Sequence, residues 1–221
     1  MKTAILVDGG FYRRRAYAAF GDKTPKERAD ELYSYCKKHL NTHGESHNEL
    51  YRIFYYDCPP MTAQIYHPLT KKTVNFAKSD TYTWANDFFN ELKKKRKVAL
   101  RMGELSEQQA HYKLKNNILN KLMRGDISVS DIKESDFLFN VEQKGVDMRI
   151  GLDIASLSYK KQVDQIVLIS GDSDFVSASK LARREGIDFI LDALHTNIKP
   201  NLFEHIDGLR TCDNAFKPKT K

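Results

Sequence analysis

The stretch QIVLISGDSDF, residues 165–175, decides the fold class of this 221-residue chain. Its first part, Gln165–Ser170, is a nearly continuous apolar run, which is typical of a strand covered on both faces of a parallel sheet. Gly171 begins a turn, and the residues after it follow a helical pattern to about Arg184, where Gly186 ends it. The stretch therefore predicts a buried strand that leads directly into a helix, as in α/β folds.

The rest of the chain alternates between apolar runs and helical segments in the same way. Further strands are expected at Thr3–Val7, Leu50–Tyr56 and Ile187–Leu191. A helix is expected over about 24–40, because Thr24, Pro25 and Glu27 form a capping box at its start. Other helices are expected over about 146–158 and 199–206, and residues 137–141 are read as a strand or the approach to a helix. This alternation predicts a single α/β domain over residues 1–210, with a parallel sheet covered by helices on both faces.

Residues 61–136 have a different character. They contain 14 Lys or Arg and 9 Asp or Glu, and we expect a basic, largely helical insertion between core strands. Tyr82–Leu92 has apolar residues at helical spacing, Val98–Met102 is compatible with a strand, and Ser106 is expected to cap a helix that extends to about Met123. The tail, 211–221, is rich in lysine and expected to fray.

Four aspartates are predicted to meet at one edge of the sheet. Asp8 follows the first strand, Asp172 and Asp174 follow Gln165–Ser170, and Asp147 opens a helix. Open parallel sheets bind ligands at the carboxyl ends of their strands. Four carboxylates at one edge would repel one another unless a cation neutralised them, and oxygen ligands suit Mg²⁺ or Mn²⁺. We therefore expect these four residues to bind a divalent metal ion and to be catalytic.

Each aspartate also has a structural interpretation. Asp8 could end a strand at a turn, Asp174 could cap a helix, and Asp147 could stabilise the first turn of a helix. The metal interpretation is favoured because three separate strand or helix ends all supply acids. Asp153 lies six residues after Asp147 on a different helix face, so it is assigned only a supporting role.

The net charge of +7 indicates affinity for polyanions, although lysine-rich helices can equally be solvated surface. Arg13 and Arg14 follow Asp8 closely, and Lys144 precedes Asp147, so these residues are expected to contact a nucleic acid near the metal. A basic run follows Trp84, Phe88 and Phe89, whose helical spacing favours core positions although such aromatics can also stack on bases. The run is also expected to bind nucleic acid, and consists of Lys93, Lys94, Lys95, Arg96 and Lys97.

Composition argues against several other classes. No apolar run reaches the roughly 18 residues that a membrane helix needs, and the run before Asp8 is too short for a signal peptide, so we expect a cytoplasmic protein without a membrane partner. The three cysteines, Cys36, Cys58 and Cys212, are far apart and have no histidines at ligand-like spacing, which argues against disulfides and structural zinc.

Several motifs together resemble the NYN domain family, within the PIN-like nuclease superfamily. They are VDGGFY at 7–12, QKGVDMRIGLDIA at 143–155 and DQIVLISGDSDFVSASKLARREGIDFIL at 164–191, with a weaker likeness of NLFEHIDGL, 201–209, to the last helix of the family. The resemblance covers roughly 1–60 and 137–210. It implies a Rossmann-like, PIN-like fold and metal-dependent hydrolysis of phosphodiesters, usually in RNA.

The resemblance also implies residue roles. Asp8 corresponds to the first-strand aspartate of the family, Asp147 to the aspartate of its KGVD motif, and Asp172 with Asp174 to the pair in its SGDSDF motif. Many members carry an asparagine in a DGxN sequence, whereas Gly10 and Phe11 follow the DG turn here.

The main functional hypothesis is a metal-dependent nuclease, specifically a ribonuclease. The alternative is a non-catalytic, regulatory module that binds nucleic acid and retains a vestigial acidic site. A phosphohydrolase of the haloacid-dehalogenase type is disfavoured, because Asp8-Gly9-Gly10 lacks the second aspartate of a DxD motif.

Overall fold

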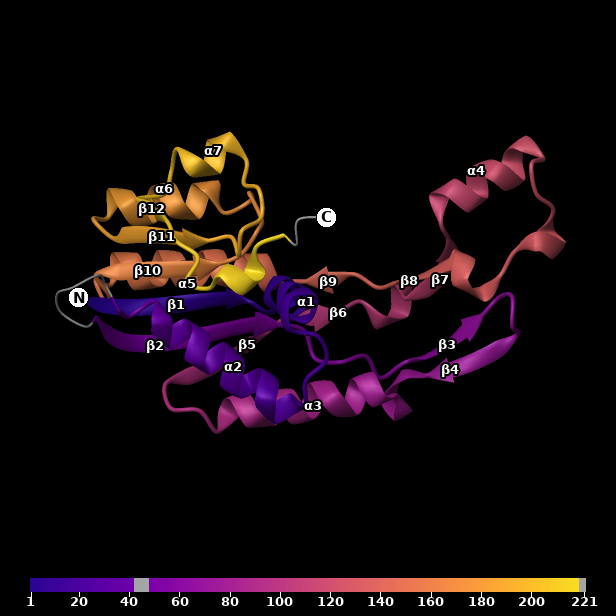
Figure 1. The fold of residues 1–221 in the computed structure, drawn as a ribbon, viewed down its shortest axis with the longest axis horizontal. Helices are drawn as coiled ribbons and strands as arrows, with labels where there is room; N and C mark the ends of the chain where they lie inside the picture. Colours follow the sequence, from indigo (N-terminus) through magenta and orange to yellow (C-terminus); the bar gives the residue numbers. More distant parts are fainter. Residues whose placement is uncertain (42–47, 219–221) are drawn as a thin grey trace.

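The structure, a computed structural model, describes residues 1–41 and 48–218. Its centre is a sheet of six parallel strands in the order β12-β11-β10-β1-β2-β5. The strands are β1 (Lys2–Asp8), β2 (Glu49–Asp57), β5 (Val98–Met102), β10 (Gln165–Ile169), β11 (Asp188–Asp192) and β12 (Gly208–Leu209). Figure 1 shows these strands side by side, with their carboxyl ends along one edge.

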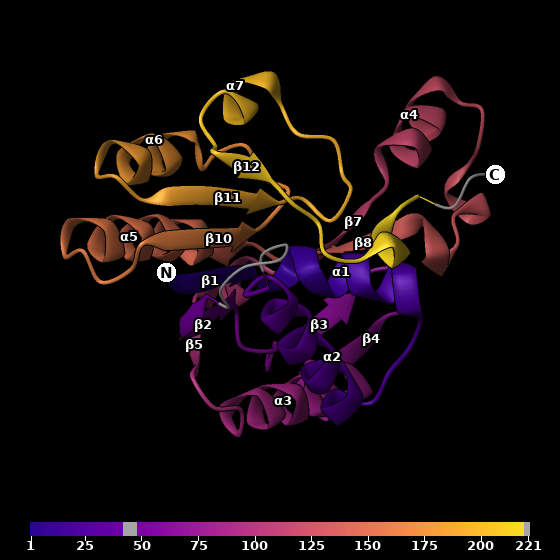
Figure 2. The same ribbon diagram turned by 60° about the vertical axis from the view of Figure 1, so that its left-hand side comes forward.

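Helices cover both faces of the sheet. On one face lie α1 (Gly9–Phe20), α2 (Pro25–Lys38) and α3 (Asp80–Lys93); on the other lie α5 (Val146–Tyr159), α6 (Val176–Arg184) and the short α7 (Pro200–Phe203). Figure 2 shows the two helical layers separated by the sheet. Successive residues of β1 face opposite layers, so Ala4 and Leu6 enter one core while Ile5 and Val7 enter the other. The predicted α/β fold with a helix-covered parallel sheet is confirmed.

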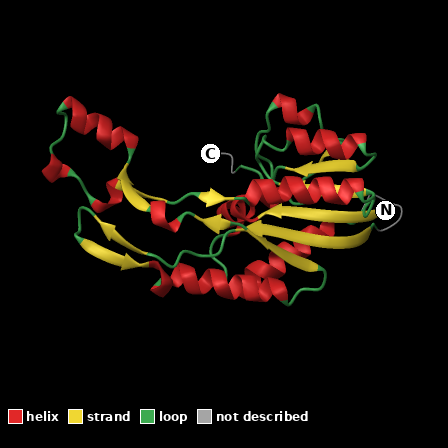
Figure 3. Ribbon diagram, turned by 180° about the vertical axis from the view of Figure 1, so that it is seen from behind, coloured by secondary structure: helices red, strands yellow, loops and turns green. Residues whose placement is uncertain are grey.

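A long extension leaves the carboxyl edge of the sheet, and we call it the arm (residues 64–75 and 104–144). Its parts are the hairpin of β3 (Gln64–His67) with β4 (Lys72–Asn75), the pair β7 (His111–Leu114) with β8 (Phe137–Asn140), the short pair β6 (Glu104–Leu105) with β9 (Gln143–Lys144), and α4 (Asn116–Arg124). Figures 1 and 3 show it reaching far from the sheet. Aromatic contacts join the β3–β4 hairpin and the residue after it to the β7–β8 pair: the ring centres of His67 and Tyr112 are 4.4 Å apart, and those of Phe76 and Phe139 are 4.5 Å apart.

The expected composition of segment 61–136 needs two corrections. The helix predicted from Ser106 to Met123 is wrong for its first half, because β7 pairs with β8 and alternates between exposed and partly buried side chains. Only α4, in the second half, is helical. Moreover, α3 and β5 belong to the main body, so only part of the segment is an insertion between core strands.

Short 3₁₀ helices complete the fold. They are η1 (Phe76–Lys78), η2 (Glu107–Gln109), η3 (Val129–Asp131), η4 (Glu134–Asp136) and η5 (Asn214–Phe216). η5 differs from the frayed tail that we expected: Phe216 is 1% exposed and packs against Tyr12, Phe20 and Tyr35. The last residues of that tail, 219–221, lie outside the described part of the chain. No described helix has the length and apolar character needed to cross a membrane.

Candidate active site

Asp8 lies where the strand order of the sheet reverses. β1 pairs with β2 on one side and with β10 on the other, and the chain continues outward in both directions from this point. Parallel sheets form a ligand-binding crevice at such a reversal. One oxygen of Asp8 accepts a hydrogen bond from the backbone N–H of Phe11 (3.0 Å) and so caps α1, while the other accepts one from Ser170 Oγ (3.3 Å).

The turn after β10 holds two further aspartates beside Asp8. The backbone N–H of Asp172 donates to Ser170 Oγ (3.2 Å), so one buried hydroxyl connects Asp8 to this turn. Asp172 in turn accepts from the backbone N–H of Asp174 (3.0 Å). Gly171 is needed here because a Cβ would lie 2.5 Å from the ring of Phe11. The alternative interpretation of Asp174 as the N-cap of a helix is wrong, since Phe175 is the N-cap residue of α6.

Asp147 approaches the same place from α5. Gly145 adopts a positive φ of 77°, which allows the chain to turn sharply into the helix, and Asp147 lies in its first turn. Burial raises the pKa of Asp147, and the negative charges of Asp8, Asp172 and Asp174 raise it further. The pKa of Asp8 is also raised, chiefly by burial. The structure therefore brings Asp8, Asp172 and Asp174 within electrostatic range of Asp147.

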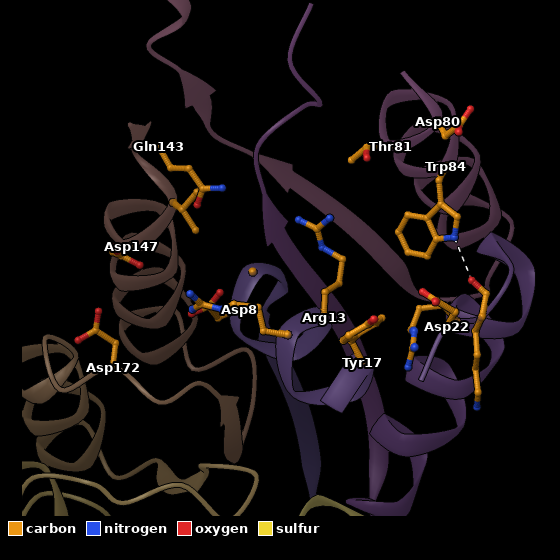
Figure 4. A pocket seen from close by; sticks show the side chains of 15 residues that line it. Asp8, Arg13, Tyr17, Asp22, Asp80, Thr81, Trp84, Gln143, Asp147 and Asp172 are labelled. Carbon is orange, nitrogen blue, oxygen red and sulfur yellow. Dashed lines mark hydrogen bonds between the residues drawn. The ribbon is translucent and has the colours of Figure 1, made fainter. Parts of the chain in front are cut away.

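A cavity of about 890 Å³ opens beside this cluster and is lined by Asp8, Asp147 and Asp172. Figure 4 shows these three side chains around one end of it. A second cavity of about 450 Å³ is lined by Asp8, Asp172, Ser173 and Lys199. Asp8, Arg14 and Asp172 line both cavities. The two cavities therefore adjoin at the acidic edge.

The cluster has the chemistry of a site for a hard cation. Among the described residues, none of its four carboxylates takes part in an ion pair. Within those same residues, no three His, Cys, Asp or Glu side chains are grouped closely enough to hold a metal ion together. Mg²⁺ is usually held by one or two carboxylates, with water and substrate phosphates as its other ligands. The four acids fit that mode of binding better than a closed protein cage.

The two arginines predicted to contact nucleic acid have different surroundings. Arg13 forms an ion pair with Asp57 (2.8 Å), a buried residue at the end of β2 that also accepts from Tyr55 Oη (3.0 Å). Gly9 lets these groups come close, because a Cβ there would lie 2.7 Å from a carboxylate oxygen of Asp57. Arg14 is exposed and lines both cavities, and its charge lowers the pKa of Asp8. Arg14 is therefore a cation beside the acids that is open to a ligand, as is the exposed Lys199 in the second cavity.

The other predicted basic contacts are not all brought to the site. The run Lys93–Lys97 precedes β5 and lies at the amino edge of the sheet, opposite the aspartates. Lys94 pairs with Glu91 (2.6 Å), Lys95 with Asp30, and Lys97 donates to the carbonyl of Leu50. Lys144 is exposed in β9, three residues before Asp147. Only Lys144 among these lysines is near the acidic edge.

Asp153 lies apart from the cluster, in agreement with the helical geometry. It accepts hydrogen bonds from Tyr56 Oη (2.8 Å) and Arg101 Nε (3.0 Å) and lines a different cavity. Two other features were missed from the sequence, the ion pair of Arg13 with Asp57 and the extension of the main cavity to Trp84. The position of Asp57 at a strand end was the one available signal for the first of these.

Comparisons with known proteins agree with part of this description. A family model described as the NYN domain matches residues 63–204, a range that includes Asp147, Asp172 and Asp174 but not β1 with Asp8. No curated protein matches the chain. Among solved structures, a protein of unknown function from Vibrio parahaemolyticus is 14% identical, with 97% of this chain and 94% of that chain covered and a TM-score of 0.48. A maltogenic alpha-amylase from Thermotoga neapolitana is 7% identical, with 94% and 48% covered and a TM-score of 0.22.

Proposed function

Because the chain belongs to the NYN domain family, which comprises nucleases of the PIN-like superfamily, we propose that it is a metal-dependent ribonuclease. The observation that carries the proposal is the convergence of Asp8, Asp147, Asp172 and Asp174 at the reversal point of the sheet, without compensating ion pairs in the described structure. Acids whose pKa values are raised by burial and mutual repulsion are typical of functional sites. They are costly for the fold unless a ligand neutralises them.

The proposed roles follow from the position of each side chain. Asp8, Asp147 and Asp172 would hold one or two Mg²⁺ or Mn²⁺ ions, each ion bound by no more than two carboxylates together with water and phosphate oxygens, and Asp174 would complete the coordination shell or orient the attacking water. The metal would neutralise phosphate charge and lower the pKa of a bound water. Ser170 fixes the orientation of Asp8 through its hydroxyl, and Arg14 can contact the phosphate at the junction of the two cavities.

The departure from the DGxN sequence lies in the first turn of α1. Where many relatives have an asparagine, Phe11 packs its ring against Gly171 and its backbone N–H binds Asp8. This contact supports the acidic turn mechanically but supplies no polar side chain to a substrate. Activity therefore depends on the four aspartates and Arg14, with no contribution from an asparagine at this position.

The decisive experiment incubates labelled single-stranded RNA with the purified chain and Mn²⁺, with excess EDTA in a parallel sample. We expect cleavage that EDTA abolishes, and a loss of more than about 100-fold in the Asp8→Asn/Asp172→Asn double variant, with an unchanged circular dichroism spectrum. DNA of the same sequence, tested alongside, reports the preference for RNA. Unchanged cleavage by the double variant would refute the proposal. RNA binding without EDTA-sensitive cleavage would favour the non-catalytic module.

A further inference from the structure

The main cavity continues from the aspartates along α1 to the start of α3, where Trp84 forms part of its wall. Phe88 stacks on the indole with ring centres 5.2 Å apart and planes 14° apart. The indole N–H donates to the backbone carbonyl of Lys23 (2.9 Å). Figure 4 shows the ring at the far side of the cavity from Asp147, with Arg13 and Tyr17 between them. Trp84 is therefore held rigidly, with its polar atom already satisfied and the ring available only for stacking.

The charges around Trp84 disfavour a phosphate at this end of the cavity. Lys23 and Arg28 share the single carboxylate of Glu31, at 2.6 and 2.8 Å, which offsets one of their two positive charges; with Asp22 and Asp80, these five groups (two positive, three negative) carry a net charge of −1. Asp22 and Asp80 also line the cavity, and neither takes part in an ion pair among the residues that the structure describes. This end therefore offers an aromatic surface and two hydrogen-bond acceptors, where the acidic edge offers a place for a cation and a phosphate.

We propose that this end of the cavity is a nucleobase subsite that prefers guanine. A base would stack on Trp84, as bases of single strands stack on aromatic side chains. Asp22 and Asp80 can only accept hydrogen bonds when ionised, and they would read the N–H groups on the base edge. Guanine fits best because its N1–H and its exocyclic N2 amino group are adjacent donors, whereas uracil offers one N–H between two carbonyls.

The subsite rests on the proposed function, because it adds a selective contact to the same nucleic-acid site. Tyr17, which is 59% exposed and lines the cavity, lies nine residues after Asp8 on α1. At about 1.5 Å per residue this is about 13 Å along the helix axis. Figure 4 shows Trp84 beyond Tyr17 as seen from the aspartates, so a base stacked on Trp84 would belong to a different nucleotide from the one whose phosphate meets the aspartates. The subsite would select the sequence around the cleavage point.

The test uses intrinsic fluorescence, because Trp84 is the only tryptophan in the chain. The full chain is titrated in EDTA with GMP, IMP and UMP, with free tryptophan amide as the correction for absorbed light. IMP is a matched probe because it lacks only the N2 amino group of GMP. We expect GMP to quench the fluorescence with a Kd at least about 5-fold lower than that of IMP, and UMP to bind most weakly. No quenching, or equal Kd values for the three nucleotides, would overturn the subsite.

Variants identify the acceptors. Asp22→Asn and Asp80→Asn should each reduce the preference for GMP over IMP toward one, because an amide offers one acceptor and places donors against the base. Asp87→Asn is the matched control, since Asp87 lies on the same helix but lines another cavity. An unchanged preference in both Asp22→Asn and Asp80→Asn would overturn the assignment. If Mn²⁺-dependent cleavage persists without any quenching, only the subsite fails; if quenching persists without cleavage, only the nuclease proposal fails.

Discussion

Asp147 and Asp153 lie on one helix, α5, in opposite electrostatic surroundings. Burial and three neighbouring aspartates raise the pKa of Asp147, whereas Asp153 accepts hydrogen bonds from Tyr56 and Arg101. A carboxyl group whose pKa is raised on folding stabilises the protein while it keeps its proton. That contribution is lost as the pH rises through the raised pKa.

We therefore predict opposite effects for two matched variants of the metal-free protein. Asp147→Asn cannot ionise, so at neutral pH it should raise Tm by up to about 2 °C, and the gain should vanish below the ordinary pKa of an aspartate. Asp153→Asn should lower Tm by about 2–4 °C at neutral pH, because it weakens two hydrogen bonds. Thermal melts between acidic and neutral pH measure both effects.

The same two variants distinguish an effect on cleavage from an effect on stability. Asp147→Asn should lose metal-dependent cleavage, and Asp153→Asn should keep it. A lower Tm for Asp147→Asn at neutral pH would show that its charge is already compensated and would contradict the electrostatic account of the cluster.

Two glycines provide a second residue-level test. A Cβ at Gly171 would lie 2.5 Å from the ring of Phe11, whereas a Cβ at Gly151 on α5 would meet nothing within 4 Å. We expect Gly171→Ala to cost about 1–3 kcal/mol through displacement of the turn or of Phe11. Gly151→Ala should add about 0.5–1 kcal/mol, because alanine loses less backbone entropy in a helix. Urea denaturation measures both changes, and equal stability of the two variants would rule out the close packing of Phe11 on the turn.

At the scale of elements, the sequence predicted the strands and helices whose patterns are unambiguous. The capping box of Thr24 and Glu27 forms at the start of α2, and the apolar run before the GDSD turn is β10. The sequence did not predict α1, because two glycines and three arginines obscured its short buried stripe of Gly9, Tyr12 and Ala16. The predicted helix at Ser106–Met123 was half wrong because the partner strand of β7, which lies at Phe137–Asn140, is remote in sequence.

The C-terminal 3₁₀ helix η5 is an element whose importance the sequence did not indicate. Arg15 donates to the carbonyl oxygens of Leu194 (2.8 Å) and Phe216, which holds the segment against α1. The ring centres of Phe20 and Tyr35 each lie 5.2 Å from that of Phe216. This segment closes the core beneath α1 and α2.

Phe216→Ala should therefore destabilise the protein by about 3–5 kcal/mol, as expected for a large buried side chain. Phe203→Ala is the control, since Phe203 is 58% exposed and its loss should change stability by no more than about 0.5 kcal/mol. Chemical denaturation of both variants provides the measurement. A Phe216→Ala variant as stable as Phe203→Ala would mean that the segment is not part of the core.

At the scale of the whole molecule, topology explains which predicted site residues meet. Asp8 and Asp172 could be predicted from strand ends alone, because the carboxyl ends of parallel strands share one edge. The run Lys93–Lys97 comes just before β5, and a helix between parallel strands returns the chain to the amino edge. Treating Val98–Met102 as a core strand would have placed the run on the side away from the acids.

The composition of the arm and the partner of Arg13 could not be predicted in this way. The arm forms through pairing between segments that are distant in sequence. Arg13 pairs with Asp57, a buried residue on another element, β2, 44 residues further along the chain. Such contacts depend on three-dimensional packing, which local patterns of hydrophobicity and charge do not encode.

The most direct test of the account is the position of Mn²⁺ in crystals of the chain soaked with that ion. We expect an anomalous difference peak at the carboxyl edge of the sheet, within ligand distance of the Asp8 or Asp172 carboxylate, and its absence in the Asp8→Asn/Asp172→Asn double variant. A peak only elsewhere in the molecule, or no peak at this edge in a protein that still cleaves RNA, would contradict it.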